Sequence, residues 1–529
     1  MSTAIKSSYV LMISGALLCL IQIWLPGHYL TCDGPCHLYN ASIVHDLWNG
    51  NNTGFYNTFY QHNYTIDPNS LTTYAMALLL FVVRGAIAEK LFLSAYALIY
   101  LSGIIVLMRR VAGNTISLWL AGGFIFIFTY ALSKGFYNFS FGVAFWVWMV
   151  WAWIRYLDRP RLSALLIYLL FSSLTFFTHL LPFVFGLITT GPLLVSYGLA
   201  TKSVKRRALL NLSAWAVAAA PFLVFTLLFT QKEGGLQLTL APHPYRLLEL
   251  IEFKYIINVV DTERPWAILA GVVIVGMMLL TIVRSISNFK WHKFDGFVGA
   301  LLIVAFVYTF FPEDFLGRAI IISIRAQLFV MLLATLVIGY RMKEGSVKNV
   351  GGILLFASFV VLSAIRMNCR QEADMALKGI LDAGKMIPDK AIVLTFDGAP
   401  GGVRPDGTPI ADRNAIFHHV THYIACDRPL ILLDNYEANT GYFPISWRNE
   451  TNPYIHLSLN GGFENDPPTA DIPNYERMSR QKVGYVIARN IRRTAHGPSS
   501  DIHRQIDSNY KVIFSDPGYK TQLLMRKHR

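Results

Sequence analysis

The residues best suited to chemistry lie in one stretch, CDGPCHLYNASIVHD at 32–46. It carries two carboxylates, Asp33 and Asp46, and two imidazoles, His37 and His45. Asp33 and His37 are four residues apart, so a helical stretch would place both side chains on one face. A carboxylate beside an apolar body is suited to take a proton from a hydroxyl or amine. We therefore predict that Asp33 is a general base; the alternative is that it only caps a helix beginning near His37.

A second chemical signal is an arginine inside an apolar run. Arg325 lies in the run 319–340, about two helical turns after Arg318. A guanidinium at membrane depth is costly unless it meets an anion. Arginine binds phosphate with two parallel hydrogen bonds, so we predict that Arg325 and Arg318 bind a lipid phosphate. The alternative partners are the carboxylates of Glu313 and Asp314.

Further polar residues stand where apolar runs meet loops. Lys134, in SKGFYNF, is a third predicted phosphate ligand, although a lysine at a membrane boundary also serves as a simple interfacial residue. Asn138 follows it closely, and His179 ends a run in FFTHLLPF, where its alternative role is a hydrogen bond to a carbonyl. His243 lies in APHPYR. Together with His37, we predict that Asn138, His179 and His243 bind substrate.

The cysteines form two candidate disulfide pairs. Cys32 and Cys36 flank the turn at Asp33, and Cys369 and Cys426 lie in the polar C-terminal part. Each pair is a candidate disulfide, and a metal site is the alternative. No CxxC pair supports a metal site, so no metal ligands are predicted, and no cofactor is certain; a divalent cation stays open. The sequence has no P-loop, dinucleotide fingerprint or HExxH motif.

The composition indicates a multi-pass membrane protein. Of the 529 residues, 54% are hydrophobic and 15% charged, whereas soluble domains carry about 25% charged residues. The net charge is +14, but the basic residues cluster between apolar runs, as in cytoplasmic loops. This pattern excludes nucleic acid as a predicted partner. The clusters are 109–110, 155–161, 202–207, 284–293 and 341–348.

An apolar run needs about 20 residues to cross a bilayer as a helix. The run 70–83 is short; placing it in the interface puts all basic clusters on one side. We predict eleven crossings with the N-terminus inside and the C-terminus outside, and counts of twelve or thirteen stay open. The first run is predicted to be an uncleaved helix. The spans are 8–25, 91–108, 115–132, 136–154, 162–180, 182–199, 211–230, 266–283, 295–311, 319–340 and 350–366.

The predicted fold is mainly α, a polytopic helical bundle followed by an α/β domain. Residues 1–366 form the membrane domain, with external loops at 26–90 and 231–265 and a surface helix in the second loop. Residues 367–529 lose the long apolar runs and form an extracytoplasmic α/β domain. Its predicted strands are AIVLTF at 391–396, PLILLDN at 429–435, YIHLSL at 454–459, VGYVIAR at 483–489 and YKVIFSD at 510–516.

This arrangement resembles the C-superfamily of glycosyltransferases, which includes aminoarabinose transferases of lipid A, protein O-mannosyltransferases and oligosaccharyltransferases. Asp33 in CDGPCHLYNA matches the acid of that family's first external loop, which is taken as catalytic. IDPNSLTTYAMALLL resembles its proline-bearing entry to the next apolar segment. FFTHLLPF and FFPEDFLGRAIIISIRAQLF resemble outer-rim segments of bacterial members. The sequence departs from the family in one respect: no second acid adjoins Asp33, and Lys134 stands where many members have an acid.

The resemblance implies a glycosyltransferase that uses a polyprenyl-phosphate-linked sugar and acts on a lipid, polysaccharide or protein acceptor. It also implies a bacterial inner membrane location, with the active site and C-terminal domain on the periplasmic side and membrane lipids as partners. Two other classes stay open: a lipid or glycan transporter or flippase, which predicts related halves with broken helices, and a non-catalytic assembly protein, which does not need Asp33. The glycosyltransferase account further predicts that Asp33 and Arg325 line one cavity open to lipid.

Overall fold

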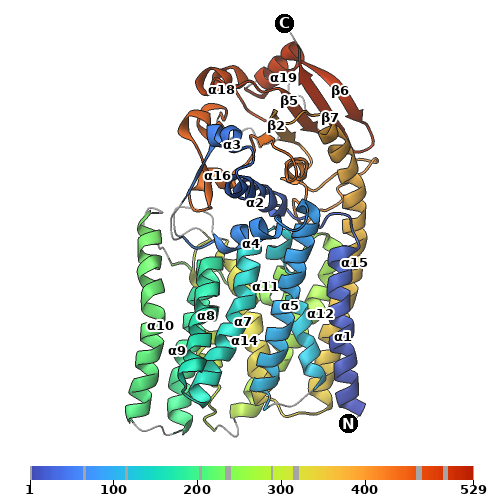
Figure 1. Cartoon of the computed structure of the whole chain (residues 1–529). Helices are drawn as coiled ribbons and strands as arrows, with labels where there is room; N and C mark the ends of the chain where they lie inside the picture. Colours follow the sequence, from blue (N-terminus) through green and yellow to red (C-terminus); the bar gives the residue numbers. More distant parts are fainter. Residues whose placement is uncertain are drawn as a thin grey trace.

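The computed structural model describes residues 3–63, 67–113, 117–201, 205–232, 240–286, 290–313, 321–459, 468–491 and 498–527. A bundle of long helices carries a smaller domain with a β-sheet at one end (Figure 1). Within the described residues, seven helices are long and apolar enough to cross a membrane, so the chain is an integral membrane protein. They are α1 (Thr3–Trp24), α5 (Gly85–Val111), α9 (Leu180–Thr201), α10 (Lys205–Lys232), α12 (Arg264–Ile286), α14 (Ile322–Arg341) and α15 (Ser346–Lys385).

The other four predicted spans also coincide with helical elements. These are η1 (Leu118–Phe126) with α6 (Tyr130–Ser133), α7 (Tyr137–Asp158), α8 (Leu162–Thr178) and α13 (Gly296–Phe310). The run 70–83 forms α4 (Leu71–Leu79), whose nine residues reach only about 14 Å. It lies across the end of the bundle (Figure 1), in agreement with its predicted interfacial position. Eleven crossings remain the prediction for the whole chain.

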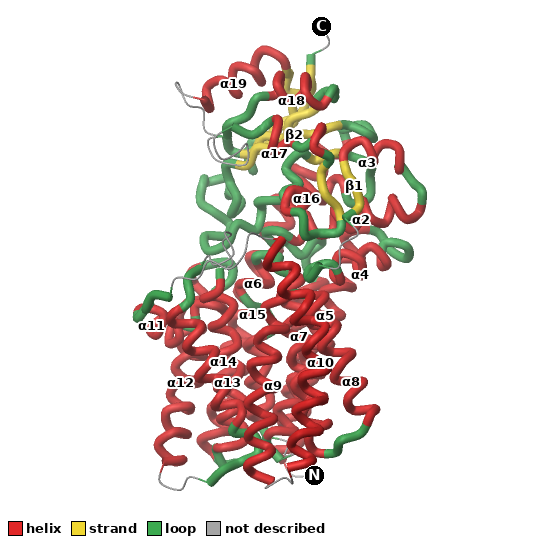
Figure 2. Tube along the Cα trace, turned by 90° about the vertical axis from the view of Figure 1, so that its left-hand side faces the viewer, coloured by secondary structure: helices red, strands yellow, loops and turns green. Residues whose placement is uncertain are grey.

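The basic clusters, as far as the structure describes their residues, lie at the end of the bundle away from the sheet domain. Arg110 at the end of α5 and Lys293 before α13 both pair with Asp158 at the end of α7. Arg341, at the end of α14, pairs with Asp295. Asp158 and Asp295 therefore offset part of the positive charge at this end, and the sheet domain lies at the opposite end (Figure 2).

The segment predicted as the first external loop is folded and packs against the C-terminal domain. It contains α2 (Gly34–Asn49), α3 (Thr53–Phe59) and β1 (Tyr60–His62), and β1 pairs antiparallel with β4 (Ile445–Trp447). Residues 34–44 of α2 are buried. Segments almost 400 positions apart in the sequence thus form one unit above the bundle, in which α2, β1 and α16 (Glu437–Thr440) lie close together (Figure 2).

The bundle and the C-terminal domain are joined by one continuous helix. α15 has 40 residues and is about 60 Å long, so it extends beyond a bilayer's hydrocarbon core of about 30 Å. No proline interrupts it. The boundary predicted at 366 falls inside this helix.

The C-terminal domain contains a five-stranded mixed sheet of order β3-β2-β5-β7-β6. β2 (Ile392–Asp397) pairs parallel with β3 (Ile431–Leu432) and β5 (Tyr485–Arg489), and β7 (Thr521–Arg526) pairs antiparallel with β5 and β6 (Tyr510–Asp516). The predicted α/β domain is confirmed. The remaining elements are α11 (Tyr245–Glu252), η2 (Lys254–Ile256), η3 (Asp261–Glu263), η4 (Val420–Ala425), η5 (Asn449–Thr451), α17 (Pro453–His456), α18 (Ile472–Ser479) and α19 (Pro498–Asn509).

One predicted strand is wrong, and three strands, β1, β4 and β7, were not predicted. YIHLSL at 454–459 begins inside α17, because Asn452 accepts a hydrogen bond from the backbone N–H of Tyr454 and Pro453 occupies the first helical turn. β7, with the sequence TQLLMR, lacks the β-branched run that marked the other strands. The surface helix predicted in the second external loop is present as α11.

All five cysteines are free and buried, so the disulfides predicted for Cys32–Cys36 and Cys369–Cys426 are wrong. The thiol of Cys369 contacts the carbonyl of Ile410, whereas that of Cys426 contacts the carbonyl of His422. Cys36 faces Asn435. We expect five thiols per chain to react with a chromogenic thiol reagent in denaturant without any reductant. A count of three or fewer would show that a disulfide exists.

Candidate active site

Asp33 is held in place by the turn that follows α6. The backbone N–H groups of Cys32 and Asp33 donate to the carbonyls of Ser133 and Lys134, both over 3.1 Å. Gly135 has a positive φ of 80°, and a Cβ there would lie 2.5 Å from the Asp33 nitrogen. Only glycine permits this approach. The backbone thus fixes Asp33 at the start of α2, over the end of the bundle.

The Asp33 side chain is not a helix cap. It precedes α2 but makes no capping hydrogen bond, so the capping alternative has no support in the described contacts. The side chain is 12% exposed, and Nε2 of His419 lies 3.8 Å from its Oδ1. Burial raises the pKa of Asp33, and nearby His37 partly opposes that rise. A shift in this direction makes a carboxylate a better proton acceptor when ionised.

His37 lies one turn further along α2 and forms a buried ion pair. Its Nδ1 is 2.7 Å from Oε1 of Glu437, and Asn40 donates to the same carboxylate over 2.6 Å. Burial opposes the charged imidazole, but Glu437 outweighs burial and raises the pKa of His37. His37 therefore places positive charge beside Asp33. Its predicted contact with substrate stays a prediction.

Lys134 and Asn138 lie on the same side of the bundle as Asp33. The ammonium of Lys134 sits over the ring of Tyr130, 5.8 Å from its centroid, and its charge acts on Asp33. Asn138, in the first turn of α7, is buried, and among the described residues its Oδ1 has no hydrogen-bond partner. Both residues remain predicted ligands of substrate or phosphate.

Arg325 is half-buried near the start of α14, between aromatic rings. Its guanidinium lies 4.8 Å from the ring centroid of Phe136 and 5.4 Å from that of Phe139. In the described part of the chain, no carboxylate lies within ion-pair distance of it, and its Nε has no hydrogen-bond partner. Glu313, considered above as a partner, pairs instead with Arg246 over 2.8 Å. The guanidinium is thus placed to accept an anionic ligand.

The segment 135–139 connects the two candidate groups. Its first residue, Gly135, packs on the backbone of Asp33, and the rings of Phe136 and Phe139 pack on Arg325. The ring of His179 packs edge-on against Phe139, with centroids 5.5 Å apart, so His179 belongs to the same neighbourhood.

One residue named from the sequence, His243, lies apart from this group in the described part of the chain. His243 contacts the ring of Tyr245, and its N–H donates to the carbonyl of Thr309; no recorded contact brings it to Asp33 or Arg325 within the described chain. Arg318 and Asp314 lie outside the described residues.

A buried glutamate near Asp33 was not identified from the sequence. Glu89, fully buried in α5, accepts hydrogen bonds from the hydroxyls of Tyr137 and Tyr423, each over 2.7 Å. Tyr137 also contacts the hydroxyl of Thr31, whose oxygen accepts from the N–H of Gly34. This network links α5, α7 and η4 to the Asp33 turn. The sequence did contain a signal for Glu89, because an acidic residue inside an apolar run, here the run after Arg84, is a candidate functional residue.

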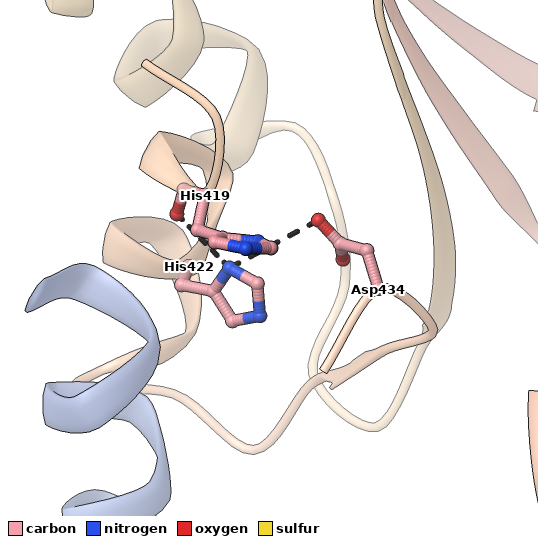
Figure 3. A group of neighbouring side chains, drawn as sticks. All are labelled: His419, His422 and Asp434. Atoms are coloured by element: carbon pink, nitrogen blue, oxygen red, sulfur yellow. Dashed lines mark hydrogen bonds and ion pairs between the residues drawn. The ribbon is translucent and has the colours of Figure 1, made fainter. Parts of the chain in front are cut away.

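His419, His422 and Asp434 were also missed. They lie together (Figure 3), with His422 Nδ1 4.0 Å from Asp434 Oδ2, and His419 borders Asp33. The sequence shows the histidine-rich run HHVTH at 418–422, but it does not show that Asp434 lies beside it in the fold.

Comparison with solved structures finds chains of similar fold. No family model matches the chain, and no curated protein sequence resembles it significantly. The crystal structure of ArnT from Cupriavidus metallidurans bound to undecaprenyl phosphate matches with a TM-score of 0.54 and 8% sequence identity. The match covers 98% of this chain and 97% of that chain. The fold expected from the resemblance is thereby confirmed: this chain has an ArnT-like fold over nearly its whole length.

Proposed function

We propose that this protein is a glycosyltransferase that moves a sugar from a polyprenyl-phosphate carrier to an acceptor, with Asp33 as general base. The observation that carries the proposal is the ArnT-like fold over nearly the whole chain. Fold alone does not define a reaction, so the site supplies the rest of the support. Asp33 and the guanidinium of Arg325 flank one short segment at the domain-bearing end of the bundle.

The proposed reaction is an exchange at the anomeric carbon of the sugar. Asp33 takes the proton of an acceptor hydroxyl or amine, and the freed oxygen or nitrogen bonds to the anomeric carbon as the bond to phosphate breaks. Arg325, assisted by Lys134, stabilises the charge that develops on the departing lipid phosphate. Contacts that strengthen as charge develops lower the barrier by a few kcal/mol each.

The proposed side of the membrane is the extracytoplasmic one. The basic residues gather at the end away from the C-terminal domain, and such clusters mark the cytoplasmic face. A carrier with a polyprenyl tail suits this location, because a membrane-bound donor reaches a face that lacks soluble nucleotide sugars. The acceptor is a lipid, a polysaccharide or a protein.

Binding of undecaprenyl phosphate to the purified protein in detergent tests the donor part of the proposal. We expect saturable binding, weakened by about 10- to 100-fold in Arg325→Gln, because a hydrogen bond to a charged group contributes about 1.5–3 kcal/mol. The control is Arg155→Gln, since Arg155 is exposed at the opposite end of the bundle beside Trp151. Equal affinity of the wild type and Arg325→Gln would contradict the assignment of Arg325.

A further inference from the structure

Two histidines and an aspartate converge between η4 and the end of β3. His419 directly precedes η4, and the N–H of His422 donates to its carbonyl over 3.0 Å. A 3₁₀ helix has three residues per turn, so side chains three apart lie on the same side. Asp434 follows β3 closely and brings its carboxylate to the same place (Figure 3).

The donor atoms of these three residues form a compact, buried set. One ligand atom from each lies within 4.8 Å of the other two, and the residues are only 2%, 0% and 3% exposed. A tetrahedral ion with ligands at 2.0–2.2 Å holds its donor atoms about 3.3 Å apart. Side-chain rotations that move the donor atoms by about an ångström would close the difference. Two imidazoles and one carboxylate are a common donor set for zinc, with one position left for a further ligand.

Unpaired atoms in the cluster point independently to a ligand. Nδ1 of His419, Nε2 of His422 and Oδ1 of Asp434 are buried, and none has a hydrogen-bond partner among the described residues. A buried polar atom without a partner costs about 1–3 kcal/mol, so three in one cluster are unusual in a well-satisfied interior. Nδ1 of His422 meets the carbonyl of His419 over 2.9 Å, so Nε2 is the nitrogen of that ring left without a partner and open to a cation.

We propose that His419, His422 and Asp434 bind one Zn²⁺ ion between η4 and β3. Coordination through Nδ1 of His419 leaves its Nε2–H directed at Asp33, whose Oδ1 is 3.8 Å away. The ion would then fix the imidazole that borders Asp33, as ligand orientation is commonly fixed in metal sites. The site does not depend on the proposed sugar transfer, since it rests on donor atoms within the C-terminal domain.

The test measures zinc binding directly. The full chain, without a polyhistidine tag, is stripped with chelator in detergent and titrated with ZnCl₂, and bound metal is counted by mass spectrometry. We expect one zinc per wild-type chain. His422→Ala and Asp434→Asn should weaken binding at least about 100-fold, because even outer partners of metal ligands change affinity 10- to 100-fold. His456→Ala is the control: His456 lies in the same domain, where its Nε2 meets the carbonyl of Asn449.

X-ray absorption of the zinc-loaded wild type reads the ligands without any variant. Two imidazole nitrogens at about 2.0–2.1 Å with at least one oxygen would support the proposal. Sulfur ligands or an all-oxygen shell would overturn it. A wild-type chain that binds no stoichiometric zinc, or variants that bind as tightly as the wild type, would overturn it equally.

Discussion

Replacing Asp33 by asparagine is expected to lower the rate of sugar transfer by about 10²- to 10⁴-fold, the usual contribution of a positioned general base. Asparagine has nearly the same size but accepts a proton far less readily. The fold should persist, because the Asp33 side chain makes no capping bond and the backbone bonds from Cys32 and Asp33 are unaffected. The loss should therefore appear in turnover while binding of undecaprenyl phosphate is kept.

The measurement follows release of undecaprenyl phosphate from a panel of undecaprenyl-phosphate sugars. The matched control is Asp46→Asn, since Asp46 lies on the same helix and pairs with His45 away from the site. We expect Asp46→Asn to keep wild-type turnover. An Asp33→Asn variant with undiminished release would remove the base from the proposed reaction, and the assembly-protein alternative would then gain support.

Replacing Glu263 by glutamine is expected to destabilise the folded protein by about 3–5 kcal/mol, the typical cost of leaving one partner of a buried ion pair unpaired. Glu263 is fully buried, and Arg366 donates to it over 2.8 Å. The same carboxylate accepts from the N–H groups of Asn258 and Val259. The pair joins the start of α12 to α15 near the domain-bearing end, so its loss weakens the link between two spans.

The free energy of unfolding in mixed detergent micelles measures this effect. Asp261→Asn is the control, because the exposed carboxylate of Asp261 pairs only with the partly exposed Arg264 and Arg413 among the described residues, and each such surface pair is worth about 0–1 kcal/mol. In the double variant Glu263→Gln/Arg366→Met, the unpaired charge is gone, so we expect a smaller loss than from Glu263→Gln alone. A loss below 1 kcal/mol in Glu263→Gln would show that the pair is not structurally important.

Hydropathy and charge predicted the larger part of the fold. The apolar runs form helices because the bilayer core lacks water, so the backbone groups must form their hydrogen bonds within the segment. The predicted order of the spans also places the basic clusters at one end of the bundle. Most strands of the C-terminal domain were found from short β-branched runs. The exception at 454–459 arose because a local cap, Asn452 with Pro453, favours a helix over the strand that the alternating pattern indicated.

The surroundings of Asp33 could be predicted only in part. Asp33 and Lys134 were identified from the sequence because each lies where an apolar run meets a loop. Glu437 and His419 were not, since they come from segments about 400 residues away, which the pairing of β1 with β4 helps to hold beside the Asp33 segment. Pairing across such distances leaves no trace in the periodicity of a single sequence. The disulfide predictions failed for the same reason: spacing alone does not show where buried thiols point.

The most direct test of the account is a structure of this protein with undecaprenyl phosphate bound. We predict that the phosphate lies on the guanidinium of Arg325, with nitrogen–oxygen distances of about 2.7–2.9 Å, on the side of the 135–139 segment that leads to Asp33. A phosphate bound at the opposite end of the bundle, or one separated from Asp33 by closely packed side chains, would contradict the account.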